Sequence, residues 1–565
     1  MCGVAGFITK DFSQADYSLI TKMLASMKHR GPDDSHVWTS RNLALGACRL
    51  SIIDLSEAAS QPMFLSYAGS RYVLAYNGEV YNFRELRAQG HVYRSQSDTE
   101  VVLTALAEDT LALRNFNGMF AFALYNEQAH TVTLARDRYG IKPLYYYEDA
   151  SVFAFASEIK ALQYLVKHDA VDLPALRDYF TFQNQLSDGT LFEGIHVLEP
   201  GTYLVYDLLK HKFITHTYFK LEFRESLKIS FDEAAEETRR LFEQAVKRQL
   251  VSDVPVASCL SAGIDSSSIV AISSKQIPRL HTFTGGFNAV PGYDESPLAA
   301  CSALAHNTEH FVAMIGPRAF EDTLHDVVYH LEDLRCSISY CDYLVYELAS
   351  KYAKVVLSGA GGDELFAGYT WRYAVQDYKL MWQRLVPVAD HASFFSQQVI
   401  KATSRYEPLD QFPKRTATLN QKLTFEANSF LRGLLFVTDK LSSAHSLEAR
   451  VPFLDNDLVD FALKLPQDYK LNDGTGKLVM REAMKGLVPE EVRVRKKQGF
   501  YPPDEHWYRG PTRAFVTERI ESVAKSGYFN EARVRGLLQE HLQGLDRTTL
   551  IYSLVCFDEW LKIFA

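Results

Sequence analysis

Hydrophobic residues follow two different patterns along this chain, and the change falls near residue 231. Up to about residue 210, short apolar or alternating runs are separated by Gly, Asn and Asp, which is typical of many short strands. The runs that predict strands are Arg71–Tyr76, Phe120–Tyr125, Thr131–Ala135, Leu144–Tyr147, Val152–Ala156 and Thr202–Tyr206. The polar stretch His211–Ser230 then predicts a linker.

From Phe231 onward, helical and strand patterns alternate. The expected elements are the helix Phe231–Leu250, strand Val254–Leu260, helix Ser266–Ser274, strand His281–Phe287, helices Ser296–His306 and Tyr343–Tyr352, and strand Lys354–Ser358. Strands that alternate with helices indicate a parallel α/β sheet. From about Asp363 to the end the pattern is mainly helical. We therefore predict two domains, residues 1–210 and residues 225–565.

Composition narrows the class of protein. A chain of 565 residues is too long for one core, and 47% hydrophobic with 23% charged residues is ordinary for a globular protein. The net charge of −9 argues against a nucleic-acid-binding body. No apolar run is long enough to span a membrane, and no secretory signal begins the chain. The seven cysteines form no Cys-x-x-Cys motif. These features predict a cytoplasmic enzyme with reduced thiols.

The first candidate for chemistry is Cys2, which lies among small residues. Removal of Met1 would make Cys2 an N-terminal nucleophile whose free α-amine, with a pKa near roughly 8, accepts the thiol proton. A chain can also start Met-Cys by accident, so the pair alone does not establish a role.

Four short motifs follow Cys2 in order. They are the turn His29–Asp33, the segment Arg49–Asp54 (read as a guanidinium at the start of an apolar strand), Asn77-Gly78-Glu79 after a strand, and Ser97–Glu100 capping a helix. Asn-Gly is also a common hairpin turn, and Ser-Asp-Thr-Glu is also a plain N-cap. Read chemically, an Asn side chain and a Gly N–H stabilise an oxyanion, while an arginine and two carboxylates match the charges of an amino acid.

Taken together, these motifs resemble the class II glutamine amidotransferase domain, an N-terminal-nucleophile hydrolase. The match continues through Arg136–Leu144 and Ser157–Lys160. The resemblance implies an αββα sandwich in the first domain. It also implies a catalytic Cys2 with Asn77 and Gly78, and a glutamine site formed by Arg49, Leu50, Ile52, Ile53, Asn77, Gly78, Glu79 and Asp98.

A second group of motifs begins where the strand Val254–Leu260 meets a helix. The loop Ser261-Ala262-Gly263-Ile264-Asp265-Ser266-Ser267 has the small residues that let N–H groups surround phosphate oxygens at a helix N-terminus. A plain strand–turn–helix corner has similar residues. The later motifs are Ser358–Tyr369, Ser446–Asp455, Lys477 with Arg481, and Lys497-Gln498-Gly499-Phe500.

These motifs resemble the synthetase domain of glutamine-dependent asparagine synthetase, whose loop is that of the N-type ATP pyrophosphatases. The resemblance implies ATP and Mg²⁺, and a mechanism in which a carboxylate is adenylated and then attacked by ammonia carried through an internal tunnel. ATP and pyrophosphate would contact Leu260, Ser261, Ala262, Gly263, Ile264, Asp265, Ser266, Ser267, Gly285, Ser358, Gly359 and the catalytic Lys477. Asp265 and Asp363 would hold the metal.

Two positions depart from that family. Ala262 replaces a Gly, which would strain the loop if the position needs a positive φ. Ala360 replaces an acid linked to the adenylate chemistry, and Glu332 or Asp333 would then be a substitute. The predicted acceptor site is Ala360, Glu332 and Arg450. A third, lesser difference is Ser443, where the family often has Met.

Several functions remain open. The leading one is a glutamine-dependent amidotransferase that converts aspartate to asparagine. The same chemistry on a sugar uronic acid or a natural-product acid is an alternative favoured by Ala360. A cyclase of the β-lactam synthetase type is disfavoured by the intact Cys2, and a glutaminase with a nucleotide-sensing second domain by the retained charged residues. The expected partners are small molecules only, and the oligomeric state, a homodimer included, is open.

Overall fold

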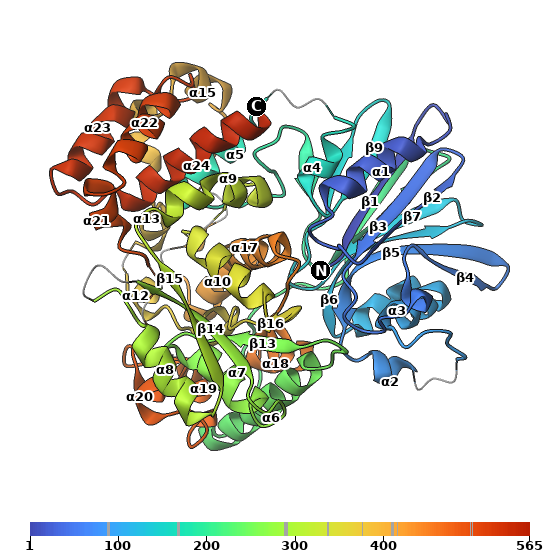
Figure 1. Ribbon diagram of the computed structural model, residues 1–565, viewed down its shortest axis with the longest axis horizontal. Helices are drawn as coiled ribbons and strands as arrows, with labels where there is room; N and C mark the ends of the chain where they lie inside the picture. The colour runs from blue at the N-terminus through green and yellow to red at the C-terminus, as the bar shows by residue number, and fades with distance from the viewer. Residues whose placement is uncertain are drawn as a thin grey trace.

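The computed structural model describes residues 1–87, 91–166, 170–287, 292–335, 338–375, 377–407, 409, 412–414, 416–497, 499 and 501–565. Figure 1 shows two parts: the first third of the chain forms a pair of sheets, and the remainder forms a separate sheet surrounded by helices. The boundary lies where the hydrophobic pattern changes.

The N-terminal part contains two six-stranded antiparallel sheets. The first has the order β10 (Ile195–Val197), β8 (Tyr145–Glu148), β9 (Val152–Ala156), β1 (Gly3–Thr9), β3 (Leu43–Arg49), β2 (Asp34–Ser40). The second has the order β12 (Lys212–Thr217), β11 (Thr202–Asp207), β7 (Thr131–Arg136), β6 (Gly118–Asn126), β5 (Ser70–Val80), β4 (Met63–Tyr67).

Apolar side chains from both sheets form one shared core. Val4 and Leu45 of the first sheet belong to the same buried cluster as Val73 and Leu134 of the second. Helix α1 (Tyr17–Ser26) covers the first sheet, and α3 (Asp98–Glu108) covers the second. The layers are therefore αββα, which confirms the predicted sandwich.

Three local predictions in this domain were wrong. The predicted linker His211–Ser230 begins with β12, whose six residues pair with β11 because Lys212–Thr217 can hydrogen-bond along that edge. Asn77-Gly78-Glu79 does not follow the predicted strand Arg71–Tyr76 but belongs to it, because β5 continues through these residues, paired with Met119–Ala121 of β6. Arg49 ends β3 and does not start a strand, because Leu50–Asp54 turns away as a loop.

The C-terminal part is built on a five-stranded parallel sheet, as predicted. Its order is β15 (Glu309–Ile315), β14 (His281–Phe287), β13 (Val256–Cys259), β16 (Val355–Leu357), β17 (Glu448–Arg450). Of these, β15 and β17 were not predicted. The predicted helices of this region correspond to α6 (Phe231–Gln249), α7 (Ile264–Ser273), α8 (Ser296–Ala305) and α10 (Tyr340–Ser350).

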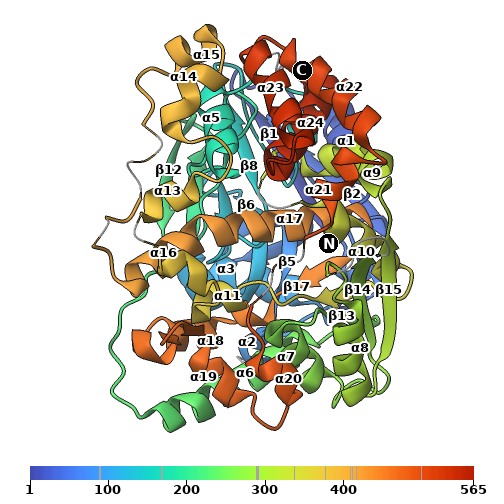
Figure 2. The ribbon, with the colours of Figure 1, turned by 90° about the vertical axis from the view of Figure 1, so that its left-hand side faces the viewer.

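Helices cover both faces of this sheet. On one face, α10 packs on β14 and β15 and is joined by α9 (Ala319–Leu331) and α17 (Phe430–Ala444). On the other, α6 and α7 share a buried cluster with Leu357. Both views place α17 at the centre of the molecule, beside the N-terminal sheets (Figures 1 and 2).

The chain after residue 363 is mainly helical, as expected. It carries α11 (Gly362–Phe366), α12 (Thr370–Tyr373), α13 (Tyr378–Trp382), α14 (His391–Phe394), α15 (Gln397–Ala402), α16 (Leu419–Asn428), α17, α18 (Asn456–Ala462), α19 (Leu478–Ala483), α20 (Glu490–Val494), α21 (Asp504–Arg509), α22 (Arg513–Ala524), α23 (Glu531–Leu542) and α24 (Thr548–Phe564). The last helix packs on α9 and α22 and closes this part of the core.

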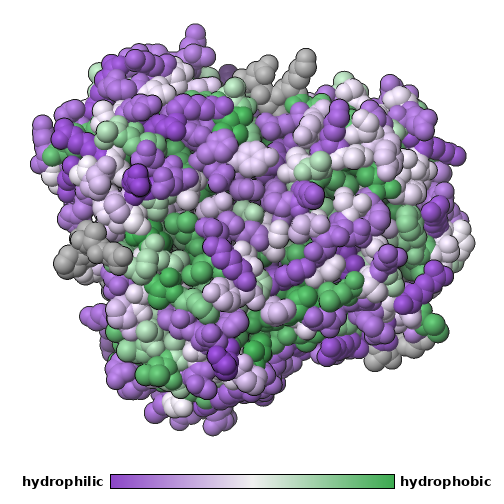
Figure 3. Space-filling model, in the orientation of Figure 1, coloured by the Kyte–Doolittle hydropathy of each residue, from purple (hydrophilic) through white to green (hydrophobic). Residues whose placement is uncertain are grey.

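Residues 218–230 link the two domains without helix or strand. They are held by hydrogen bonds such as Phe223 N to Thr424 Oγ1 (3.0 Å) and Arg224 N to Leu463 O (2.9 Å). On the face shown in Figure 3, hydrophilic side chains are spread over both domains and apolar ones are exposed in small groups. In the described part of the chain, no helix combines the length and apolarity needed to span a bilayer.

Candidate active sites

Cys2 directly precedes β1 in the N-terminal domain. Its N–H donates to Asn77 Oδ1 (3.2 Å), its carbonyl accepts from Arg30 Nε (3.0 Å), and its Sγ is 4.0 Å from Leu50 O. Burial raises the pKa of the Cys2 thiol, so a nearby base is needed to form the thiolate. Met1 is also buried, and burial lowers the pKa of its amino group to about 6.

Asn77 and Gly78 adjoin this thiol from β5. Asn77 is fully buried, and its Nδ2 has no hydrogen-bond partner among the described residues. A buried amide donor left unpaired costs free energy unless a ligand accepts from it. Gly78 faces Phe120 of β6, and a Cβ there would lie 2.2 Å from Met119 O, so the close approach of the strands requires glycine. The Gly78 N–H as an oxyanion donor stays a prediction.

Two buried carboxylates complete this site. Glu79 Oε2 has no partner among the described residues, whereas Asp98 accepts from Tyr76 Oη and Val80 N, both at 2.9 Å. Burial, followed by the charges of Asp98 and Glu448, raises the pKa of Glu79 well above its usual value. Glu79 is therefore a carboxyl that would gain from a bound ammonium group.

Arg49 supports the loop that borders the site. Its guanidinium donates to the carbonyls of Ser56 (3.1 Å), Ile53 (3.4 Å) and Asp54. The side chains of Leu50, Ile52 and Ile53 are buried in an apolar cluster with Phe83, Val101 and Val355. Only the backbone of these three residues is thus available to a glutamine, and Arg49 also has a structural task. Ser97 caps α3 through Thr99 N, as expected.

The predicted phosphate loop joins β13 to α7. Its hydroxyls bond within the loop: Ser266 Oγ accepts from Ser261 N (2.9 Å), and Ser261 Oγ accepts from Gly263 N (3.2 Å). Ala262 is not among the residues with positive φ, so the substitution of Gly by Ala brings no backbone strain. Ser267 is fully buried, and its Oγ has no hydrogen-bond partner among the described residues.

The two predicted metal-binding residues lie together beside this loop. Lys477 Nζ is 2.5 Å from both Asp265 Oδ2 and Asp363 Oδ1, and Lys497 Nζ is 2.9 Å from Asp363 Oδ2. Burial alone would raise the pKa of Asp363, but Lys477 and Lys497 hold it well below its usual value. For Asp265, burial is the stronger effect and raises the pKa.

The residues present fit a magnesium ion. Asp265 Oδ1 is buried and has no partner among the described residues. Within that part of the chain, no group of three or more His, Cys, Asp or Glu forms a protein-only metal cage. Mg²⁺ characteristically binds one or two carboxylates together with substrate phosphates, so Asp265 and Asp363 suffice as its protein ligands.

A cavity of about 300 Å³ lies at this edge of the sheet. Of the predicted nucleotide-site residues it is lined by Leu260, Ser261, Asp265, Ser266, Gly285, Ser358 and Gly359, together with Asp363 and Ala360. An adjoining cavity of about 80 Å³ is lined by Ala262, Gly263, Ile264 and Lys477. The predicted nucleotide residues therefore converge, apart from Ser267.

Two predicted acceptor residues lie elsewhere, which corrects that part of the assignment. The carboxylate of Glu332 is buried between Lys440 Nζ (2.5 Å) and Lys160 Nζ (3.0 Å). Arg450 is fully buried, 2.8 Å from Glu448 Oε1 and 3.8 Å from Glu79 Oε1. Both residues contact the N-terminal domain, because α9 and β17 lie against it. Asp333, the other proposed substitute, pairs with Arg335 at 2.7 Å.

Sequence reasoning missed how the two domains hold each other. Arg30, in the predicted turn, donates to Glu158 Oε1 (3.0 Å) and Asp439 Oδ2 (2.8 Å) while also binding the Cys2 carbonyl. Asp439 is on α17, so the second domain helps to fix Cys2. Lys497 was also missed as a site residue, although its motif had been noted; Gln498 and Phe500 of that motif lie outside the described residues.

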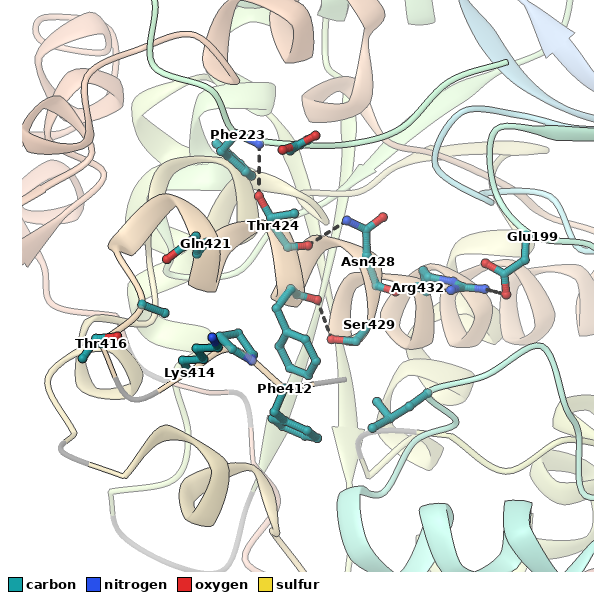
Figure 4. Close-up of a pocket in the computed structure, with 15 residues that line it drawn as sticks. Glu199, Phe223, Phe412, Lys414, Thr416, Gln421, Thr424, Asn428, Ser429 and Arg432 are labelled. Carbon is teal, nitrogen blue, oxygen red and sulfur yellow. Dashed lines mark hydrogen bonds and ion pairs between the residues drawn. The ribbon is translucent and has the colours of Figure 1, made fainter. Parts of the chain in front are cut away.

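A wider cavity, of about 880 Å³, contains none of the predicted site residues. It lies between the linker, α16 and α17, where Phe223, Thr424 and Asn428 form hydrogen bonds among themselves and Arg432 pairs with Glu199 (Figure 4). Several of its polar groups are thus engaged with one another, and size alone does not identify a site.

Comparison with known proteins agrees with this geometry. The asparagine synthase family model matches residues 237–562, and the glutamine amidotransferase domain model matches residues 1–219. Asparagine synthetase [glutamine-hydrolyzing] 1 of Bacillus subtilis (strain 168) is 33% identical, covering 100% of this chain and 97% of that protein. Asparagine synthetase [glutamine-hydrolyzing] 3 of the same organism is 32% identical, covering 90% and 88%. Asparagine synthetase B of Escherichia coli (strain K12) is 31% identical, covering 84% and 77%.

Proposed function

Because this chain belongs to the glutamine-hydrolysing asparagine synthetase family, we propose that it transfers the amide nitrogen of glutamine to a carboxylate at the expense of ATP. It is a carbon–nitrogen ligase of the amidotransferase type. The leading acceptor is aspartate and the leading product asparagine.

The first half-reaction takes place at Cys2. After removal of Met1, the α-amine of Cys2 accepts the thiol proton, and Sγ attacks the amide carbon of glutamine. A C–S bond forms, the C–N bond breaks, and ammonia leaves with the transferred proton. Water then hydrolyses the thioester to glutamate. The unpartnered Nδ2 of Asn77 supports its role as a donor to the oxyanion.

Glutamine itself is held by its charges. The orphaned Oε2 of Glu79 supports this carboxylate, together with Asp98, as the partner of the α-ammonium. Arg49 would attract the α-carboxylate as well as hold its loop. The buried position of these groups strengthens each charge interaction relative to water.

The second half-reaction takes place beside the 261–267 loop. A carboxylate oxygen of the acceptor attacks the α-phosphorus of ATP, the bond to the β-phosphate oxygen breaks, and pyrophosphate leaves. Lys477 and Lys497 neutralise the charge that builds on the phosphates. Asp265 and Asp363 would hold Mg²⁺, which would supply positive charge to stabilise the departing pyrophosphate.

Ammonia completes the reaction. Its nitrogen attacks the acyl carbon, the C–O bond to AMP breaks, and AMP leaves with the electron pair while the nitrogen loses a proton. AMP is a far better leaving group than a carboxylate oxygen, which is why activation precedes amidation. Helix α17 borders both sites, since its Leu434 lines the nucleotide cavity and its Asp439 binds Arg30 beside Cys2, so ammonia would travel within the protein.

One observation carries the proposal: Lys477 Nζ bridges Asp265 and Asp363 at 2.5 Å beside the phosphate loop. The triad supplies two carboxylates and a cation where the phosphates of ATP would lie, which is what the release of pyrophosphate requires. The experiment is to measure pyrophosphate and AMP release with ATP, Mg²⁺ and glutamine, with and without aspartate, and to identify the products by mass spectrometry. Aspartate-dependent AMP together with asparagine is expected.

A second candidate acceptor is a carboxylic acid other than aspartate. Ala360 lines the cavity where the family has an acid, and Glu332 is engaged with Lys440 and Lys160. Glutamine hydrolysis without aspartate-dependent AMP would favour this candidate, and uronic acids and natural-product acids would be tested next.

A further inference from the structure

Asp342 is a carboxylate of the nucleotide cavity that the proposed reaction does not use. It lies in the first turn of α10 and lines the 300 Å³ cavity together with Ala360, Tyr346 and Leu434. The middle of β14 (Phe283–Gly285), together with the residues at the ends of β13 and β16, forms the side of the cavity to which the nucleotide contacts were assigned. Asp342 is therefore on the wall that remains for the acceptor.

An acidic residue at the third position of a helix commonly accepts from the N-cap N–H. Asp342 does not have this task, because the N–H of the N-cap Ser339 donates to Tyr552 Oη at 3.1 Å. Among the described residues, no hydrogen bond or ion pair of the Asp342 side chain is found. Its presence in the first turn is thus not explained by capping.

The other two carboxylates of the cavity are matched by cations. Asp265 contacts Lys477, and Asp363 contacts both Lys477 and Lys497. In the described lining, Asp342 is the carboxylate that lacks such a cation. Burial alone raises the pKa of Asp342 to about 6, so at neutral pH it is mostly an anion with poor solvation. Such a group gains most from a bound cation.

The wall around Asp342 leaves room for a ligand. Ala360 projects only a methyl group, and Val345, Tyr346 and Leu434 provide apolar surface. Apolar lining with one placed charge is typical of a small-molecule subsite. An ammonium group that reached Asp342 would form a charge-assisted hydrogen bond shielded from water.

We propose that Asp342 is a specificity-determining residue that binds the ammonium group of the carboxylate acceptor. The inference rests on the proposed function, since it concerns the acceptor of the same site. Asp342 selects acceptors that carry a positive charge near the reacting carboxylate, as aspartate does. It disfavours uronic acids and dicarboxylic acids, which carry no such charge.

The test compares aspartate with succinate, which has the same carbon skeleton and no amino group. Binding is measured by isothermal titration calorimetry on the full chain with Mg²⁺ and α,β-methylene-ATP. In this analogue a CH₂ group replaces the oxygen between the α- and β-phosphorus atoms, so pyrophosphate cannot leave. The variants are Asp342→Asn, which keeps the shape, and Glu347→Gln on the same helix, whose exposed side chain pairs with Lys351. Pyrophosphate release with ATP is measured in parallel.

In the wild type and E347Q, the Kd for aspartate is expected to be at least about tenfold lower than the Kd for succinate. In D342N the two Kd values should lie within about threefold of each other. Affinity for the nucleotide should be equal in all three proteins. Discrimination that survives in D342N, or is absent from the wild type, overturns the inference. A loss of nucleotide affinity in D342N with unchanged discrimination overturns it too, because Asp342 then contacts the nucleotide.

The titration separates this inference from the proposed function. If no carboxylate releases pyrophosphate but aspartate still binds in preference to succinate and D342N removes that preference, the proposed function fails and the ammonium subsite stands. If pyrophosphate release is normal and D342N has no effect on the preference for aspartate, the proposed function stands and the ammonium subsite fails.

Discussion

The guanidinium of Arg450 lies 3.8 Å from the carboxylate of Glu79, across the boundary between the two domains. Arg450 ends β17, which pairs with β16, and the predicted ATP contacts Ser358 and Gly359 follow β16 directly. The carboxylate proposed to hold glutamine thus touches the sheet that carries the other site. Both side chains are buried, so the contact is weakly screened by solvent.

Replacing Cys2 with Ala should abolish glutamine use and leave synthesis from free ammonia intact. The reason is that the thiol takes part only in the release of ammonia, whereas the ATP site lies in the other domain. Amide formation is measured with glutamine and with ammonium chloride. Equal loss of both activities would contradict a two-site enzyme.

The affinity for glutamine should depend on the ionisation of Glu79. Burial, with Asp98 and Glu448, raises the pKa of this carboxyl, and only its ionised form attracts an ammonium. The KM for glutamine should therefore fall as pH rises through this elevated pKa. In Glu79→Gln the KM should be about tenfold higher or more and lack this dependence.

The assay for Glu79 is glutaminase kinetics over a range of about pH 6 to pH 9, within which the α-amine of Cys2 also titrates. The α-amine acts as a base and so affects kcat, which separates the two groups. Glu57→Gln, an exposed residue of the same domain, serves as the control. A wild-type KM that does not change with pH would exclude the assigned role.

Replacing Arg450 with Lys should weaken glutamine binding without removing the ATP chemistry. Arg450 donates to Glu448, to Gln249 O and to Val251 O, which a single ammonium cannot satisfy together. The charge of Arg450 also lowers the pKa of Glu79. If lysine places its charge farther away, the pKa of Glu79 rises and the fall in KM moves to higher pH. The thermal midpoint is recorded as well; a lower midpoint with an unchanged KM profile would leave Arg450 a purely structural residue.

Replacing Lys477 with Met should reduce pyrophosphate release by about 100-fold or more, because the charge beside the phosphates is lost. Glutamine hydrolysis should remain, since Cys2 lies in the other domain. Lys485→Met is the matched control, because that exposed lysine follows α19 and pairs only with Glu482 among the described residues. Normal pyrophosphate release in K477M would remove Lys477 from the catalytic residues.

Replacing Ala360 with Glu should raise aspartate-dependent pyrophosphate release. The methyl group of Ala360 lines the cavity, and neither Glu332 nor Asp333 reaches it as a substitute acid, because both are paired with basic residues. Initial rates at saturating ATP provide the comparison. An unchanged rate would mean that the chemistry needs no acid at this position.

The hydrophobic pattern and the capping residues of a segment predicted those helices and strands whose formation depends mainly on their own residues. The strand His281–Phe287 was placed at its observed bounds, and the helix from Phe231 ends within one residue of the prediction. The strand is visible in the sequence as a continuous apolar run. The helix start is visible as a capping box, in which Ser230 and Glu233 bond each other and no other segment is needed. The loops 261–267 and 358–369 were predicted as sites because small residues follow a strand in each, and residues of both line the same cavity.

Elements that depend on a partner were missed or misplaced. The strand β17 is only Glu-Ala-Arg, and it is extended because its residues pair with those of β16. The strand predicted to end at Tyr76 continues through Asn77 and Gly78, because β6 runs alongside them and keeps their backbone extended. Both segments are extended because they pair with strands distant in sequence, so their own residues show no alternating hydrophobic pattern.

The sequence by itself determined the two domain types and the order of the motifs, and it predicted most of the residues that the structure brings together around Cys2 and beside the 261–267 loop. Tertiary structure alone decided how those sites are joined: Arg30 binds Asp439 across 409 positions of sequence, and Arg450 reaches Glu79 instead of the acceptor cavity. The physical reason is that propensity, capping and periodicity act over a few residues. Which buried charges meet depends on how whole domains pack, because each must find a partner once water is excluded.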